Sequence, residues 1–240
     1  MGNISIKYTE SIMPGRLVIY DDNSFKSDSK DLIKNDMIGN LNPRYNIAPT
    51  IPIPVLLNNG NYLYAHFGYL PSWTKDKKSM NINARSESLF EKMTFRDSFK
   101  CRRCIIPING FFEWEVEDKK KTPYFVSNLQ DNYLAVAGIW DEWFDIELNM
   151  KIVTVALITC DANEKLSKIH HRMPVVLEKK DFAKWLSDSS IKELNELFKI
   201  YANEKLDLFE VSSEVNKVLF DKVNCIEKIE KKEVGQLALF

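Results

Sequence analysis

A glutamate set among aromatic side chains is the residue of this sequence best suited to acid–base chemistry. Glu113 lies between Phe112 and Trp114, with Phe111 one residue earlier. Burial among such side chains disfavours a charged carboxylate, raises its pKa and suits the carboxyl group to proton transfer near neutral pH. The competing interpretation is a glutamate on an edge strand whose carboxylate stays in water.

A pair of histidines forms the second candidate. His170 and His171 are two of the three histidines in the chain, and Arg172, Met173 and Pro174 follow them. The pattern predicts a loop over these residues after a buried strand, and loops of this kind often carry binding and catalytic residues. A histidine placed there can transfer protons or orient a phosphate. The alternative is one exposed imidazole and one packed imidazole without a functional role.

An amide, a guanidinium and three ring side chains complete the candidate set. The Asn83 amide can hold an aldehyde or hydroxyl oxygen, and Arg85, two residues later, can bind a phosphate. Trp73, Trp114 and Pro49 can stack against bases, as side chains of single-strand binding proteins do. The alternatives are turn chemistry for Asn83, a surface ion pair for Arg85 and core packing for the rings.

Positive charge is concentrated around these residues. Nine Lys or Arg residues and four acids lie between Lys75 and Cys104, in a chain whose net charge is −1. A local excess of five positive charges favours an anionic partner. The near-neutral total argues against general coating of nucleic acid, but it is compatible with a local basic groove.

The cysteines indicate a reducing compartment. Cys101, Cys104, Cys160 and Cys225 are too few for a disulfide framework in 240 residues. No run of 18 apolar residues and no secretory signal is visible, so we expect a cytoplasmic protein without a membrane span. Cys101 and Cys104 have the spacing of a zinc hook, but a second hook is missing, so no metal and no cofactor are expected.

Short strands dominate the predicted secondary structure, which indicates one α+β domain with a mostly antiparallel, barrel-like sheet. An Asn-Gly hairpin is predicted over Asn58–Asn61, a lysine turn over 119–121 and a loop over 44–50. The predicted strands cover 16–20, 54–57, 62–70, 104–108, 112–116, 123–127, 133–140, 152–159 and 207–211. The predicted helices cover 31–34, a stretch from a capping box at Ser88 and Glu91 to Phe99, and 161–168, 181–186 and 190–201.

Seven motifs in a fixed order give the sequence a family resemblance. They are Arg44–Thr50 (RYNIAPT), Gly68–Trp73 (GYLPSW), Asn83–Glu87 (NARSE), Phe95–Asp97 (FRD), Arg103–Trp114 (RCIIPINGFFEW), Ala137–Trp140 (AGIW) and His170–Pro174 (HHRMP). From about Met13 onward the chain resembles the SRAP family, the SOS response-associated peptidases or abasic site processing proteins. The resemblance implies one domain over residues 14–240 behind an extension of residues 1–13.

The family resemblance also implies a function and a set of roles. Its members bind single-stranded DNA in a basic groove and react with the aldehyde of abasic sites through an N-terminal cysteine, which yields a stable thiazolidine crosslink. By motif, Asn83 would hold the sugar, Glu113 would manage protons at the amine and His170 would act as acid or base. Arg16 and Arg85 would bind phosphates, while Trp73, Trp114 and Pro49 would contact bases. We expect a monomer whose partner is single-stranded DNA containing abasic sites.

One departure from the family pattern changes the expected chemistry. The family begins Met-Cys-Gly-Arg, whereas this chain has Met13-Pro14-Gly15-Arg16, so Pro14 stands at the position of the nucleophile. Without a thiol no thiazolidine can form. Either the protein binds abasic DNA without a crosslink, or Pro14 becomes the N-terminus and its secondary amine forms a reversible iminium with the aldehyde. A third interpretation is an artefact of the gene boundary.

The sequence is also compatible with three other functions. The family suggests self-processing, here before Pro14, although that peptide bond lacks an amide hydrogen and the family's thiol is absent. A binding module without any covalent step predicts salt-sensitive DNA affinity. A zinc-dependent hydrolase would use the cysteines together with His170.

Overall fold

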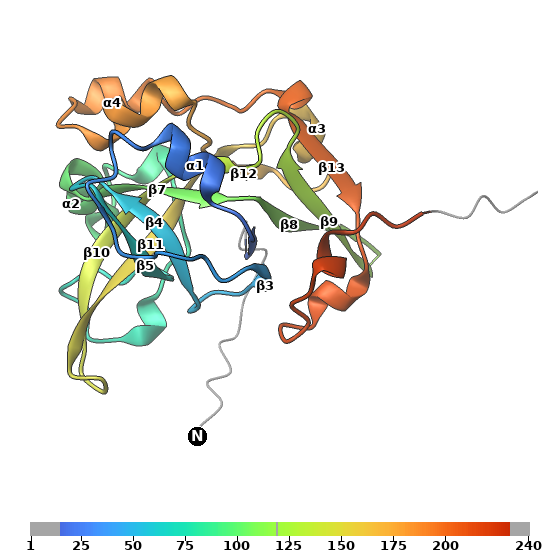
Figure 1. Ribbon diagram of the computed structural model, residues 1–240, viewed down its shortest axis with the longest axis horizontal. Helices are drawn as coiled ribbons and strands as arrows, with labels where there is room; N and C mark the ends of the chain where they lie inside the picture. The colour runs from blue at the N-terminus through green and yellow to red at the C-terminus, as the bar shows by residue number, and fades with distance from the viewer. Residues whose placement is uncertain (1–14, 119, 231–240) are drawn as a thin grey trace, which may run out of the picture.

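Stretches of β-branched and alternating apolar residues form two sheets, with the helices at the periphery (Figure 1). The computed structural model describes residues 15–118 and 120–230. Within these residues one sheet has eight strands and the other has five. The predicted α+β class with mostly antiparallel strands is confirmed.

Five strands of the larger sheet form a closed ring. They are β4 (Pro52–Leu57), β5 (Asn61–Phe67), β7 (Arg103–Ile108), β10 (Leu134–Asp145) and β11 (Met150–Asp161). Four of the pairings are antiparallel. The ring closes because β11 also pairs in parallel with β5, with Thr154 opposite His66. The predicted barrel-like sheet is therefore confirmed.

Three very short strands extend the barrel sheet at its edges. They are β2 (Asn35–Asp36), β6 (Asn83–Arg85) and β12 (Arg172–Pro174). β6 runs parallel to β11 and β12 runs antiparallel to it, and both meet the last residues of β11. These pairings bring two of the seven sequence motifs to one end of one strand.

The second sheet is antiparallel throughout and follows directly from the barrel. Its order is β13 (Leu206–Glu210), β9 (Lys120–Asn128), β8 (Gly110–Glu117), β1 (Arg16–Ile19) and β3 (Arg44–Ile47). Asn109 alone separates β7 from β8. Gly110 is required at this crossing, because a Cβ there would lie 2.4 Å from the Phe125 ring and 2.5 Å from a backbone oxygen.

The helices are short and lie outside the barrel. They are α1 (Asn23–Asp28), α2 (Met93–Cys101), α3 (Glu164–Ser167), α4 (Phe182–Leu186) and α5 (Ile191–Asn195). Six 3₁₀ turns lie at Lys77–Ser79, Ser86–Ser88, Lys179–Asp181, Asn203–Lys205, Ser213–Asn216 and Val223–Ile226. Among the residues described, no helix is long and apolar enough to cross a membrane.

The core follows from the apolar runs of the sequence. The predicted strand over 152–159 lies within β11, and its residues from Val155 to Ile158 are completely buried. The predicted hairpin at Asn58–Asn61 is also present, and Gly60 takes a φ of 89°, which an Asn-Gly turn accommodates. The turn predicted over 119–121 begins earlier, at Asp118, because Lys120 and Lys121 already pair with β8.

Several local predictions are wrong, and distant contacts explain them. The helix predicted over 31–34 is absent, and α1 forms earlier because Phe25 packs among the rings of Tyr62, Tyr133 and Phe182. Residues 44–47 form β3 instead of a loop, since they pair with β1. The loop predicted over 170–174 likewise contains β12.

Helix boundaries differ from the predicted ones in the same way. The capping box predicted at Ser88 and Glu91 is absent, because α2 begins only after Lys92. The capping box that does form joins Ser190 and Glu193 at α5, and that helix ends at Asn195 rather than 201. The helix predicted over 161–168 contains only α3. The domain boundary at Pro14 lies outside the described residues.

Candidate active site and DNA interface

The end of β11 brings together two of the predicted site residues. Thr159 is paired with Arg85 of β6 and with Pro174 of β12. Asn83 therefore lies on one side of β11, and the segment that carries His170 lies on the other. Glu113 comes from β8 in the second sheet and makes no side-chain hydrogen bond to either of them.

Glu113 is buried, as its aromatic neighbours predict. Its side chain is 3% exposed, and Phe111 and Phe112 on either face of β8 are fully covered. Burial raises the pKa of Glu113 well above 4.5, although a hydrogen bond from the Trp114 backbone acts in the opposite direction. Arg16 is opposite Phe112, so the first described residues enter β1 beside Glu113. A buried carboxyl group of this kind holds a proton at a higher pH than a free glutamate does.

His170 is a buried, neutral imidazole with one donor left over. It is 8% exposed and stacks on His171 with 4.3 Å between ring centres. Burial, and then repulsion from His171, lowers the pKa of His170 to about 4. Its Nδ1 accepts a hydrogen bond of 3.1 Å from the backbone N–H of Arg172, so the proton of the neutral ring belongs on Nε2. That Nε2 is buried and has no partner among the residues described.

Asn83, Arg85 and Trp73 have positions compatible with a ligand. Asn83 is half-buried in β6, and Arg85 on the same strand is exposed. Within the described part of the chain, the guanidinium of Arg85 makes no hydrogen bond or ion pair. The Trp73 side chain is 66% exposed, which is unusual for so large a ring. The assignment of these residues to sugar, phosphate and base contacts stays a prediction.

Contacts within the protein or burial restrict three other predicted DNA-binding residues, Arg16, Trp114 and Pro49. Arg16 Nη1 donates to Asn46 Oδ1 at 2.7 Å and to a backbone carbonyl at 3.1 Å. The indole N–H of Trp114 donates to Asn216 Oδ1 at 2.7 Å. Pro49 is buried. Their DNA contacts stay predictions, and the segment after β13 already contacts two of the three.

One arginine of the basic stretch, Arg103, is buried and cannot contact a ligand in a surface groove. Arg103 is completely buried and donates to four backbone carbonyls, two from α2 and two from α4 and the residue after it. Arg102 pairs with Asp141. The exposed basic residues of this stretch without an ion pair to another described residue are Lys75, Lys78, Arg85, Lys92 and Lys100. The local excess of positive charge is thus smaller at the surface than in the sequence.

Three of the four cysteines are buried, and Cys101 is exposed. Pro14 lies outside the described residues. Cys104 is fully buried, and Cys160 is 5% exposed with its pKa raised to about 11 by burial. Cys225 is also buried, and Cys101 is exposed at the end of α2. Residues 15–118 and 120–230 contain no group of three His, Cys, Asp or Glu residues that could hold a metal ion.

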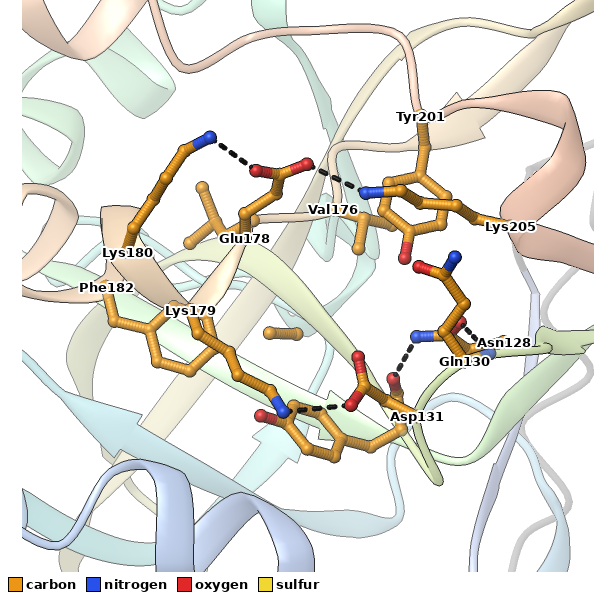
Figure 2. Close-up of a pocket in the computed structure, with 13 residues that line it drawn as sticks. Asn128, Gln130, Asp131, Val176, Glu178, Lys179, Lys180, Phe182, Tyr201 and Lys205 are labelled. Carbon is orange, nitrogen blue, oxygen red and sulfur yellow. Dashed lines mark hydrogen bonds and ion pairs between the residues drawn. The ribbon is translucent and has the colours of Figure 1, made fainter.

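Figure 2 shows a pocket of about 280 Å³ that none of the predicted site residues lines. Glu178 accepts from Lys180 at 2.6 Å and from Lys205 at 2.9 Å. Lys179 pairs with Asp131 at 2.9 Å. Because the lysines at its rim are already paired with carboxylates, this pocket offers no free positive charge to an anion.

Sequence reasoning missed two charged residues at the end of β11. Glu87 and Arg172 form an ion pair of 2.7 Å, although 85 positions separate them in the sequence. Both belong to motifs that carry the family resemblance, Glu87 to NARSE and Arg172 to HHRMP. The motif positions were therefore the available signal, but no local pattern predicts the contact.

Comparison with known proteins gives the chain its family. The model of a family described as SOS response associated peptidase (SRAP) matches residues 13–218. Abasic site processing protein YoqW of Bacillus subtilis is 36% identical over 186 residues, which are 74% of this chain and 83% of that protein. Abasic site processing protein YoaM of the same organism is 33% identical over 212 residues, 85% of this chain and 93% of that protein.

More distant relatives give the same family name or share the fold. Abasic site processing protein HMCES of Gallus gallus is 29% identical over 228 residues, 80% of this chain and 68% of that protein. A crystal structure of a protein from Bacteroides thetaiotaomicron has the same fold, with a TM-score of 0.77 at 24% identity, over 89% of this chain and 100% of that one. The family model and these relatives cover most of the sequence, and this chain belongs to the SOS response-associated peptidase (SRAP) family.

Proposed function

We propose that this protein binds single-stranded DNA and recognises abasic sites through the groups gathered around β8 and the end of β11. The observation that supports this most is the unpartnered Nε2 of His170, a buried hydrogen-bond donor without an acceptor among the described residues. Buried donors are rarely left unpaired in native proteins, and an exception calls for an explanation. A hydroxyl or aldehyde oxygen of an abasic sugar would supply the missing acceptor.

Glu113 is the natural partner of His170 in this chemistry. The raised pKa of Glu113 and the lowered pKa of His170 favour uncharged forms of both groups near neutral pH. Each can then donate a hydrogen bond to an oxygen of the sugar, and the protonated carboxyl of Glu113 can also transfer its proton. Asn83 would hold a second oxygen by its amide, and Arg85, exposed beside it, would bind a phosphate of the same strand.

A covalent step is open to this chain only through an amine. If residues 1–13 are removed, the nitrogen of Pro14 can attack the aldehyde carbon and form a carbinolamine. The hydroxyl group then leaves as water after it accepts a proton, and an iminium ion remains. Glu113 would supply that proton. Water reverses the iminium, so the adduct would be transient, in contrast to a thiazolidine.

We propose further that the protein acts as a monomer in the cytoplasm and that residues 14–240 form its domain. The four cysteines, none of which is in a disulfide, support a reducing compartment. Cleavage before Pro14 by the protein itself is the less favoured second activity, because the family's thiol is missing. The intact mass after long incubation tests it, since self-processing would remove residues 1–13.

Binding is tested first with the full chain and fluorescent single-stranded DNA. We expect tighter binding to an oligonucleotide with one abasic site than to the intact oligonucleotide, and an affinity that falls with added salt. Equal affinity for both oligonucleotides would reject abasic-site recognition. A tetrahydrofuran site, which has no aldehyde, separates recognition of shape from chemistry at the aldehyde.

The covalent step needs a second experiment. Protein that begins at Pro14 is incubated with aldehydic abasic DNA and sodium borohydride, which would reduce an iminium to a stable adduct of higher mass. Protein that keeps residues 1–13 is the matched control, because its Pro14 nitrogen is an amide. If neither sample forms an adduct, the covalent step is rejected and non-covalent binding remains as the proposed function.

A further inference from the structure

One buried guanidinium joins the two segments that carry Asn83 and His170. Arg172 is 8% exposed. Its Nη1 and Nη2 donate to the two carboxylate oxygens of Glu87 at 2.7 and 2.9 Å. Nη1 also donates to Asp161 at 2.8 Å, and Nη2 donates to the backbone carbonyl of Thr159 at 2.6 Å. Such a bidentate pair fixes direction as well as distance.

These contacts connect three strands that share little backbone pairing. β6 pairs with β11 through three residues, and β12 pairs with it through another three. Glu87 lies two residues after the end of β6, in the turn Ser86–Ser88. Arg172 opens β12 and reaches across the end of β11 to that turn. A side-chain link therefore joins β6 to β12 in addition to the backbone pairing that each makes with β11.

The same residue determines the hydrogen bonding of His170. The backbone N–H of Arg172 donates to His170 Nδ1, which keeps the ring proton on Nε2. If Arg172 shifts, this hydrogen bond weakens and the proton can occupy either nitrogen. Among the described residues, Glu87 is the one carboxylate that ties Arg172 to the β6 side, because Asp161 belongs to β11 itself.

We propose that Glu87 is a positioning residue of the site, which acts through Arg172 to hold His170 with its Nε2–H directed at the ligand and to fix the distance between Asn83 and His170. This inference rests on the proposed recognition of abasic DNA for its functional meaning. The geometric part, the control of the imidazole proton by Glu87, stands independently of any ligand.

The pair stays charged under ordinary conditions. Although burial acts in the opposite direction, the hydrogen bond from Arg172 lowers the pKa of Glu87 below 4.5. The Glu87 side chain is itself 53% exposed, and Arg172 keeps Asp161 and Thr159 when Glu87 is changed. A substitution at Glu87 should therefore leave the folded protein intact.

The test compares Glu87→Gln with two control variants in the full chain. Asp161→Asn removes the same charge from Arg172 without touching the link to β6. Glu178→Gln removes a half-exposed carboxylate that bridges Lys180 and Lys205 away from the site. Imidazole ¹⁵N shifts report which nitrogen of each histidine carries the proton, and a His170→Gln variant assigns the His170 signals.

We expect wild-type protein and both controls to show the Nε2–H form of His170, and Glu87→Gln to show a mixture of both neutral forms. Preference for abasic over intact single-stranded DNA should fall about tenfold in Glu87→Gln, the scale seen when supporting groups of a site are removed. Affinity for intact DNA should not fall, because the variant loses a negative charge.

Unchanged His170 shifts in Glu87→Gln would overturn the inference, whatever the DNA measurements give. The proposed function fails by a different result, namely wild-type protein that binds abasic and intact DNA equally. In that case the histidine spectra still decide whether Glu87 controls the imidazole proton. A loss of abasic preference with unchanged spectra also counts against the inference, since it would mean that Glu87 contacts DNA directly.

Discussion

A buried neutral imidazole makes the protein less stable in mild acid. Burial and the neighbouring His171 lower the pKa of His170 from 6.5 to about 4. Between these values the unfolded chain binds a proton that the folded protein does not, so the contribution of His170 to stability grows with pH across this window. From pH 5 to pH 7.5 the two pKa values correspond to at most about 2 kcal/mol, and residual contact with water reduces this toward about 1 kcal/mol.

Urea unfolding of wild type and His170→Gln, followed by tryptophan fluorescence at both pH values, measures this contribution. Glutamine does not titrate, so the advantage of wild type over the variant should be about 1–2 kcal/mol larger at pH 7.5 than at pH 5. Taking the difference cancels the other titrating groups. Leu219→Ala, at a side chain 98% exposed, is the control whose difference should not change with pH. The same advantage at both pH values for His170→Gln would refute the assignment of a buried neutral imidazole.

Three other substitutions test the remaining electrostatic claims. Glu113→Gln should show the opposite pH dependence. Burial raises the pKa of Glu113 above 4.5, so above that pH the folded protein keeps a proton that the unfolded chain releases. The stability of the variant relative to wild type should therefore rise from pH 5 to pH 8, and a fall over this range would contradict the raised pKa. Arg85→Gln should lower the slope of log affinity for single-stranded DNA against log salt by about 0.7, and an unchanged slope would remove Arg85 from the phosphate contacts. Arg103→Leu should cost more than about 3 kcal/mol in urea unfolding, since it leaves two buried and two partly buried carbonyls without their donor, and a loss below about 1 kcal/mol would show that water replaces it.

Much of the sheet structure could be predicted from local sequence. The β-branched run that became β11 and the Asn-Gly hairpin between β4 and β5 are specified by residues close to one another. The burial of Glu113 was predictable for the same reason, because its aromatic neighbours belong to the same strand. Propensity and alternation describe such features well when the strand is long.

The rest depended on contacts between distant residues. β6 and β12 are three residues long and exist as strands only because β11 pairs with them. Closure of the barrel needs β5 beside β11, which lie about ninety positions apart in the sequence. Arg103 counts as a surface cation in any charge tally, yet its guanidinium lies in the core. The ion pair between Glu87 and Arg172 is of the same kind.

The proline at the nucleophile position changes the product of the site more than its proton chemistry. A thiol would trap the aldehyde by closing a ring, and Pro14 has none. Burial raises the pKa of Glu113, and the backbone N–H of Arg172 leaves the ring proton of His170 on Nε2, so the proposed proton chemistry of these two groups does not require a thiol. In the proposed function such a site would bind the open sugar and assist an amine, and every step up to the iminium would be reversible. On the proposed function, dissociation rather than destruction of a crosslink would therefore end the complex with abasic DNA.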